Sequence, residues 1–128
     1  MPTDPLSSAL TLPFRYRVYR GLGLCAGLLR LSGGQLSIEY RLTYAGVAKR
    51  HVQVIHIPLN VVEEVDYRQP WLDPASLMLR LSRLDLVDRM PGQSAAEFLI
   101  GIPKSKRELA RKFAAALEYE VSNAKLRH

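Results

Sequence analysis

Few side chains in this 128-residue chain have the type and spacing that metal binding or catalysis requires. Its three histidines are His51, His56 and His128. His51 and His56 are five residues apart on one expected strand, so they should point to opposite faces and not converge on one metal ion. The single cysteine, Cys25, cannot form a disulfide or a multi-cysteine metal site within this sequence. We therefore expect no metal, and we expect Cys25 to be a small buried residue of a strand.

Gly21, Gly23 and Ala26 match the G-x-G-x-x-A string of dinucleotide-binding folds. In those folds the string opens a helix directly after a strand. Here a glycine hairpin, expected at 32–35, follows within a few residues and leaves no room for that helix. Neither a nucleophile elbow nor a P-loop occurs in the sequence. The sequence therefore predicts no cofactor and no enzymatic activity.

A small acidic cluster is formed by Glu63, Glu64 and Asp66. Paired carboxylates perform acid–base chemistry when burial separates their pKa values. On a strand, however, Glu64 and Asp66 share one face and Glu63 lies on the other. With valines alternating beside them, a solvated strand face is the favoured interpretation.

Basic residues carry more information, because the chain holds 18 Lys or Arg against 12 Asp or Glu and has a net charge of +6. One group lies on or beside the loop after an expected strand: Arg41, Lys49 and Arg50. A second group crowds the first half of an expected helix: Lys104, Lys106, Arg107, Arg111 and Lys112. Cations at a helix N-terminus oppose the macrodipole, so this group indicates either recognition of phosphate or an acidic protein surface, or an exposed face that only keeps the chain soluble. Aromatic residues that could stack on bases are not interleaved there, so we do not expect a nucleic-acid partner.

Aromatic residues in expected edges and loops are candidates for an interface with another protein: Phe14, Tyr16, Tyr19 and Trp71. The segment 14–19 begins by alternating apolar and basic residues, as an extended edge does. Trp71 lies in a loop between two prolines, where it could pack as a lid on the core or anchor a partner.

These residues must be positioned by strands, because most of the chain follows a period of two. Leu36, Ile38, Tyr40 and Leu42 alternate with polar residues, which predicts a half-buried strand. The full set of expected strands is 14–19 leading into 24–31, 36–43, 50–57, 62–68, 77–81, 84–86 and 96–102. The turn Ser32-Gly33-Gly34-Gln35 supplies the positive φ angles of a tight hairpin. A slip in phase at Arg83 indicates a turn or bulge between the two strands around it.

The period changes to 3.6 near residue 105, which predicts one amphipathic helix over about 105–124. Ser105 and Glu108 have the spacing of a capping box. The apolar stripe of this helix should dock on the strands: Leu109, Ala110, Phe113, Ala114, Leu117, Val121 and Ala124.

Length and composition fit a single domain over 14–128 preceded by a flexible arm over 1–13. The beginning of the sequence lacks the basic and apolar regions of a secretory signal. Its longest apolar stretch, 21–29, is far below the roughly 18 residues that span a bilayer. A cytoplasmic location is therefore expected, with peripheral attachment to a membrane as a further option.

This order of strands and helix resembles a bacterial pleckstrin-homology (PH)-like domain. The resemblance covers about 21–124 and rests on several segments: 27–31, the hairpin into 36–40, the Ile57-Pro58-Leu59 step, 77–79 and 98–100. It implies a mainly β fold with one α-helix, in which seven strands form a partly open barrel of two roughly orthogonal sheets and the C-terminal helix caps one end. Phosphoinositide-binding relatives of that superfold cluster Lys and Arg around the first hairpin, which is expected here at 32–35 and has only Arg30 close by.

From these observations we expect a non-enzymatic binding or assembly module that self-associates or binds a protein. The alternative is peripheral binding of anionic lipid headgroups, or of another phosphate-bearing ligand, through a basic patch. No small-molecule ligand is indicated by the sequence.

Overall fold

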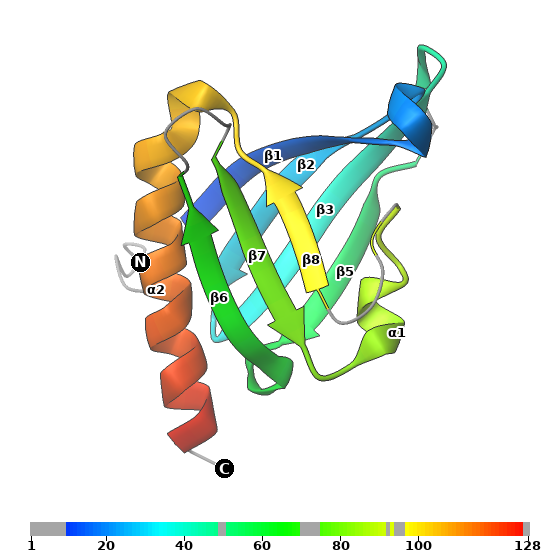
Figure 1. Cartoon of the computed structure of the whole chain (residues 1–128). Coiled ribbons are helices and arrows are strands. Elements are labelled where there is room, and N and C mark those ends of the chain that lie inside the picture. The colour runs from blue at the N-terminus through cyan, green and yellow to red at the C-terminus, as the bar shows by residue number, and fades with distance from the viewer. Residues whose placement is uncertain (1–9, 49–50, 70–74, 92, 94–96, 127–128) are drawn as a thin grey trace, which may run out of the picture.

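The computed structural model describes residues 10–48, 51–69, 75–91, 93 and 97–126. Figure 1 shows two antiparallel sheets that face each other, with one long helix packed along their side. Seven strands have five or more residues, and an eighth, β4, has two. The prediction of a mainly β fold with a C-terminal helix is therefore confirmed.

The long sheet is built from β1, β2, β3 and β5, with the short β4 added at one end of β3. Their bounds are Leu10–Val18 for β1, Gly23–Ser32 for β2, Gln35–Tyr44 for β3, Val47–Ala48 for β4 and Gln53–Pro58 for β5. The second sheet has the order β6-β7-β8, with β6 at Val62–Arg68, β7 at Ser76–Leu81 and β8 at Glu97–Gly101. All pairs are antiparallel.

Alternation decides which side chains enter the core. Leu36, Ile38 and Tyr40 of β3 are buried, as their period of two predicted. Gly33 and Gly34 have φ angles of +60° and +75° and form the tight β2–β3 turn. Cys25 is fully buried in β2, which confirms its predicted place.

The two sheets meet at two seams. On one side the chain passes from β5 to β6 through the 3-10 turn η3 (Leu59–Val61). On the other side β8 approaches β1 so closely that a Cβ on Gly101 would lie 2.6 Å from the carbonyl oxygen of Arg15. No strand ladder joins the sheets within the described residues, so the barrel is not closed.

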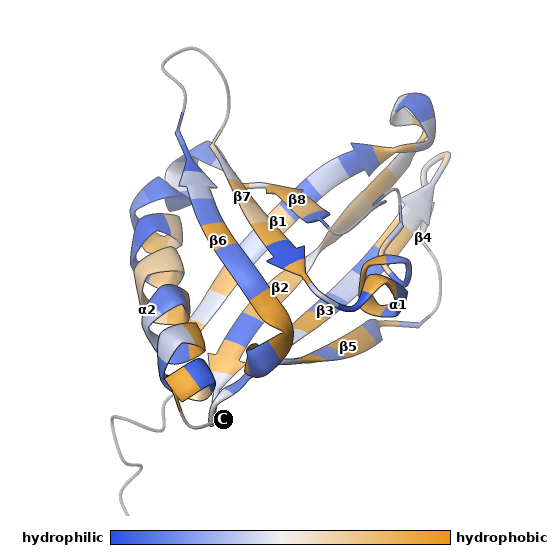
Figure 2. Ribbon diagram, turned by 60° about the horizontal axis from the view of Figure 1, so that its bottom comes forward, coloured by the Kyte–Doolittle hydropathy of each residue, from blue (hydrophilic) through white to orange (hydrophobic). Residues whose placement is uncertain are grey.

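The C-terminal helix α2 spans Arg107–Leu126 and packs against β6, η3 and β1. Its stripe is buried at Ala110, Phe113, Ala114, Leu117 and Val121, as predicted. Figure 2 shows this apolar side turned toward the sheets and the hydrophilic side turned outward.

The expected capping box at the start of α2 is wrong. Ser105 lies inside a separate 3-10 turn, η4 (Lys104–Lys106), so it does not occupy the N-cap position of the long helix. The carboxylate of Glu108 pairs with Arg111 instead of reaching back to the chain before the helix.

Residues 84–86 form helix α1 (Leu84–Val87) and not the expected strand. The phase slip at Arg83 marks the end of β7, after which Leu86, Val87 and Met90 enter the core from a compact turn. Two tyrosines hold this segment in place. The hydroxyl of Tyr16 donates to the carbonyl of Pro91 at 2.7 Å, and that of Tyr40 donates to the carbonyl of Arg89 at 2.8 Å.

The expected arm over 1–13 is too long at its end, because β1 begins at Leu10 and Leu12 is fully buried. Residues 1–9 lie outside the described part of the chain. Because β1 is a full strand of the sheet, the first hairpin is not the one at 32–35. It connects β1 to β2 through residues 19–22, whereas Gly33 and Gly34 form the second hairpin.

Candidate functional site

Two of the four expected interface aromatics belong to the interior. Phe14 is 2% exposed, because β1 continues the inward alternation that begins at Leu12. Tyr16 is half-buried and its hydroxyl is bonded to Pro91. Tyr19 is exposed, whereas Trp71 lies outside the described residues. The proposed aromatic interface is therefore wrong for Phe14 and Tyr16.

The basic groups predicted from the sequence do not form one surface. Arg41 is exposed on β3, while Lys49 and Arg50 lie outside the described residues. Along the start of the helix, Lys104 and Lys106 are exposed in η4 and Arg107 is half-buried.

At the first turns of α2, Arg111 is paired with Glu108, which also lies four residues before Lys112 on the same helix. Within the described part of 101–118, no large apolar side chain is exposed. The start of α2 is therefore a cationic surface whose charge is partly balanced by Glu108 and on which no large apolar side chain is exposed.

A different basic surface lies on the outward side of β1. Arg15 and Arg17 point outward from β1 because Phe14 and Tyr16 point inward. Across the sheet, Arg15 pairs in register with Ala26, which in turn pairs with Arg41. Neighbouring strands lie about 4.8 Å apart, so Arg15 and Arg41 flank the small Ala26 side chain at a backbone separation of about 10 Å.

We use the name tip for Arg15, Arg17 and Arg41 together with the two turns that close this end of the long sheet, residues 19–22 and residues 44–47. Figure 1 shows the two turns side by side at the end of β1, β2 and β3. The amide of Ala45 donates to the carbonyl of Leu22 at 2.8 Å, which joins the two turns directly. The rings of Tyr19 and Tyr44 pack edge to face with centroids 5.6 Å apart.

The charge of the tip is uncompensated among the described residues. Arg15, Arg17, Arg20 and Arg41 are all exposed, and none of them forms an ion pair with a described residue. Glu39 is the only acidic residue between positions 5 and 62, and its carboxylate faces Arg30 at 3.7 Å. Residues 1–62 carry seven Lys or Arg and two Asp or Glu, so this half of the chain holds +5 of the net +6.

Apolar side chains accompany these arginines. Tyr19, Leu22, Tyr44 and Val47 are between 43% and 69% exposed. Figure 2 shows β4 and its hairpin beside the hydrophilic turn η2 (Tyr19–Gly21). The tip therefore combines exposed apolar groups with cations on one structural unit.

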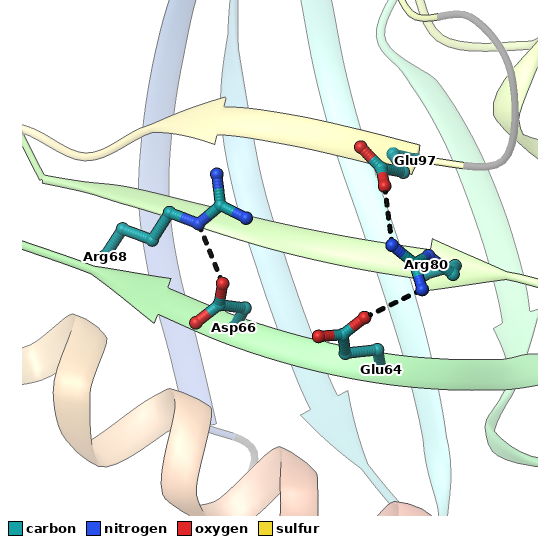
Figure 3. Close-up of polar contacts among 5 residues, drawn as sticks. All are labelled: Glu64, Asp66, Arg68, Arg80 and Glu97. Atoms are coloured by element: carbon teal, nitrogen blue, oxygen red, sulfur yellow. Dashed lines mark hydrogen bonds and ion pairs between the residues drawn. The ribbon is translucent and has the colours of Figure 1, made fainter.

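The acidic cluster of the second sheet is solvated, as expected, and two of its three carboxylates, those of Glu64 and Asp66, have basic partners. Figure 3 shows Arg80 between Glu64, at 3.1 Å, and Glu97, at 2.9 Å. The hydrogen bond to Glu97 and then the charge of Glu64 raise the pKa of Arg80. Asp66 pairs with Arg68 at 2.7 Å. This face is an ion-pair network and not an acid–base pair.

Buried titratable groups serve packing. Burial raises the pKa of Tyr16, of Tyr40 and of the Cys25 thiol. All three are therefore held protonated, and the thiol is not a nucleophile. Among the described residues, no group of three His, Cys, Asp or Glu side chains could hold a metal ion.

One cavity of about 210 Å³ lies between the β2–β3 turn and α2, beside Leu10, Gly33 and Tyr119. It is smaller than the roughly 300–1,000 Å³ of ordinary ligand pockets.

No described helix is both long and apolar enough to cross a membrane.

Sequence reasoning missed Arg15, Arg17 and Arg20 as site residues, although two signals were present. One is the run of acid-free sequence from 5 to 38, which contains four arginines. The other is the Gly-Leu-Gly sequence at 21–23, where the turn after β1 leads into β2.

Comparison with protein-family models, curated proteins and solved structures finds no match to this chain.

Proposed function

We propose that this protein is a non-enzymatic module that docks on an anionic, phosphate-bearing membrane surface through its tip. The observation that carries the proposal is the set of exposed arginines at the tip, which have no described acidic partner. A cluster of one sign of charge creates a local potential that attracts acidic ligands.

The chemistry of arginine suits this role. A guanidinium donates two parallel hydrogen bonds to a phosphate, and it is less strongly hydrated than the ammonium of lysine. Arg15 and Arg41 extend from either side of Ala26 on the outer face of the sheet. Because Ala26 is small, a phosphate group could be reached from both sides.

Self-association or binding of a protein is the second candidate function. It is favoured by apolar side chains that are exposed on α2, at Tyr119 and Leu126. The tip itself suits a second copy less well, since tip-to-tip contact would bring the arginines of both copies together and like charges repel. Light scattering at increasing protein concentration tests this candidate, because a monomer at every concentration would rule out self-association.

A PH-like assignment is part of the same proposal. It is supported by the order of the two sheets and by the C-terminal helix that packs beside β1 and β6. The hairpin between β1 and β2, and not the one at 32–35, is then the first hairpin, and it does carry basic residues.

Co-sedimentation with vesicles tests the proposed function. The protein should bind vesicles that contain phosphatidylserine and remain in solution with vesicles of phosphatidylcholine alone. Binding should weaken as ionic strength rises, because salt shortens the Debye length to about 8 Å near physiological conditions. Absence of binding to phosphatidylserine vesicles at low salt would refute the proposal.

A further inference from the structure

The cavity beside α2 lies at the end of the long sheet that is opposite the tip. Its wall comes from the start of β1, the β2–β3 turn and the second half of α2. Leu10, Leu31 and Ala116 supply the apolar part of this wall. The volume of about 210 Å³ exceeds the roughly 150 Å³ that holds a benzene molecule in an apolar cavity. The cavity is therefore large enough for one side chain.

The polar part of the wall consists of Ser32, Tyr119 and Glu120. Glu120 is partly buried and follows Ala116 by four residues, so the two lie on one side of α2. Its carboxylate forms no ion pair with any residue that the structure describes. Among the same residues, the side chains of Ser32 and Tyr119 have no hydrogen-bond partner. One negative charge and two hydroxyl groups thus line the cavity with their bonding capacity unused.

We infer that this cavity binds a lysine side chain presented by a partner protein. An ammonium group has three N–H donors, and the carboxylate of Glu120 with the hydroxyls of Ser32 and Tyr119 offers acceptors for them. The ring of Tyr119 also attracts a cation that lies over its face. The four-carbon stem of lysine would lie along the apolar part of the wall.

This site does not depend on docking at the tip, because the two surfaces lie at opposite ends of β1, β2 and β3. It adds a partner of defined chemistry at a second surface. An anionic membrane is a poor occupant here, since the carboxylate of Glu120 repels lipid phosphates.

Basic side chains of the same chain are placed elsewhere. The nine residues before Leu10 contain no Lys or Arg. Arg30, near the β2–β3 turn, faces Glu39 at 3.7 Å. Lys125 follows Glu120 by five residues, a spacing that turns it away from Glu120 around the helix. The cation that complements Glu120 is therefore expected from another molecule.

An NMR titration with short peptides tests the inference. The probe is a capped pentapeptide of Gly and Ser with one central Lys, and its neutral match carries norleucine, which keeps the apolar stem and lacks the charge. The Lys peptide should shift the backbone amide signals of Gly33, Gly34 and Tyr119 and leave those of Arg20 and Ala45 in the tip unchanged. The norleucine peptide should bind about tenfold more weakly or less, because it cannot form charge-assisted hydrogen bonds.

Two variants locate the charge that the peptide recognises. Glu120→Gln keeps the shape of the side chain and should lower affinity for the Lys peptide by about tenfold, with no change for the norleucine peptide. The matched control is Glu118→Gln, which removes the same charge from an exposed position two residues earlier, on the other side of the helix. This control should bind the Lys peptide within about twofold of the wild type, because an exposed charge outside the cavity is screened by salt.

A third variant tests the cavity itself. Ala116→Leu places a larger apolar side chain in the wall and should abolish binding of both peptides. Circular dichroism shows whether this variant folds, and Glu120→Gln supplies the test if it does not. Binding of the Lys peptide to a folded Ala116→Leu variant with unchanged affinity would overturn the cavity as the site.

The remaining outcomes are also decisive. Equal affinity for the Lys and norleucine peptides, equal loss in Glu120→Gln and Glu118→Gln, or no shift of the cavity signals at millimolar Lys peptide would overturn the inference. Tighter binding of a peptide with Arg in the central position would overturn the choice of lysine. Shifts of the same signals that grow with protein concentration in the absence of peptide would show that a second copy fills the cavity, and would overturn the assignment to a different protein.

Discussion

Neutralising the arginines of the first hairpin should weaken binding to anionic vesicles far more than neutralising the same number of cations elsewhere. The variant combines Arg15→Gln, Arg17→Gln and Arg20→Gln. All three side chains are exposed and none has a described acidic partner, so their removal breaks no described ion pair. The fold should therefore be unaffected, and circular dichroism with thermal unfolding checks this.

The magnitude follows from the position of the charges. A basic side chain near an anionic membrane contributes about 1 kcal/mol to binding. Three of them contribute about 3 kcal/mol, which corresponds to a rise in Kd of about 100-fold. The measurement is vesicle co-sedimentation with phosphatidylserine at low and at physiological ionic strength.

A matched control distinguishes a defined site from net charge. Lys104→Gln, Lys106→Gln and Lys112→Gln remove the same charge from the start of α2, where all three lysines are exposed. This second variant should lose clearly less affinity than the arginine variant, because its lysines lie in η4 and α2 and not in the tip. Equal loss in the two variants would mean that only net charge matters. An arginine variant that binds normally would refute the tip as the docking surface.

Three further predictions concern the framework that holds the tip. Gly27→Ala should destabilise the protein by about 1–3 kcal/mol or more in denaturant unfolding, because the new Cβ would overlap the carbonyl oxygen of Glu39; an unchanged midpoint would contradict this. Ala45→Asn should raise stability by up to about 1 kcal/mol in thermal unfolding, since Ala45 has a φ of +51° and Asn tolerates this conformation better. Burial raises the pKa of Tyr16 and Tyr40 above the ordinary value of 10.0, so the folded state keeps protons that the unfolded state releases above that pH. Stability should be full below pH 10.0 and fall as pH rises further, and an absorbance titration should show these two tyrosines ionising after the exposed ones.

The strands and the C-terminal helix could be predicted because burial repeats in sequence. Leu36, Ile38 and Tyr40 on β3, and Phe113 and Leu117 on α2, are buried where their periods placed them. Residues that point into the core recur with the period of their strand or helix, and this period can be recognised in the sequence itself.

Local sequence could not decide the elements that depend on distant partners. Leu84 and Leu86 continue an apolar pattern, yet α1 forms there because Leu86 fills the core beneath a segment anchored by Tyr16 and Tyr40. Likewise Ser105 has the chemistry of a cap but lies in its own 3-10 turn.

The candidate site was missed for a related reason. Three prolines in 1–13 indicated an arm, whereas Leu12 enters the core and Pro13 of β1 pairs with Leu28 of β2. The alternation expected over 14–19 already puts Arg15 and Arg17 on one face, but it does not show which residues of other strands lie beside them. Pairing between strands places Arg15 and Arg41 on either side of Ala26, and the spacing of residues along the chain does not record this arrangement.

Hydrogen–deuterium exchange of the intact protein with and without phosphatidylserine vesicles tests the central claim most directly. Docking through the tip predicts slower exchange at residues 19–22 and 44–47 on addition of vesicles, and unchanged exchange along the exposed side of α2. Protection at the start of α2 with none at the tip would contradict the account, as would identical exchange everywhere under conditions in which the protein sediments with the vesicles.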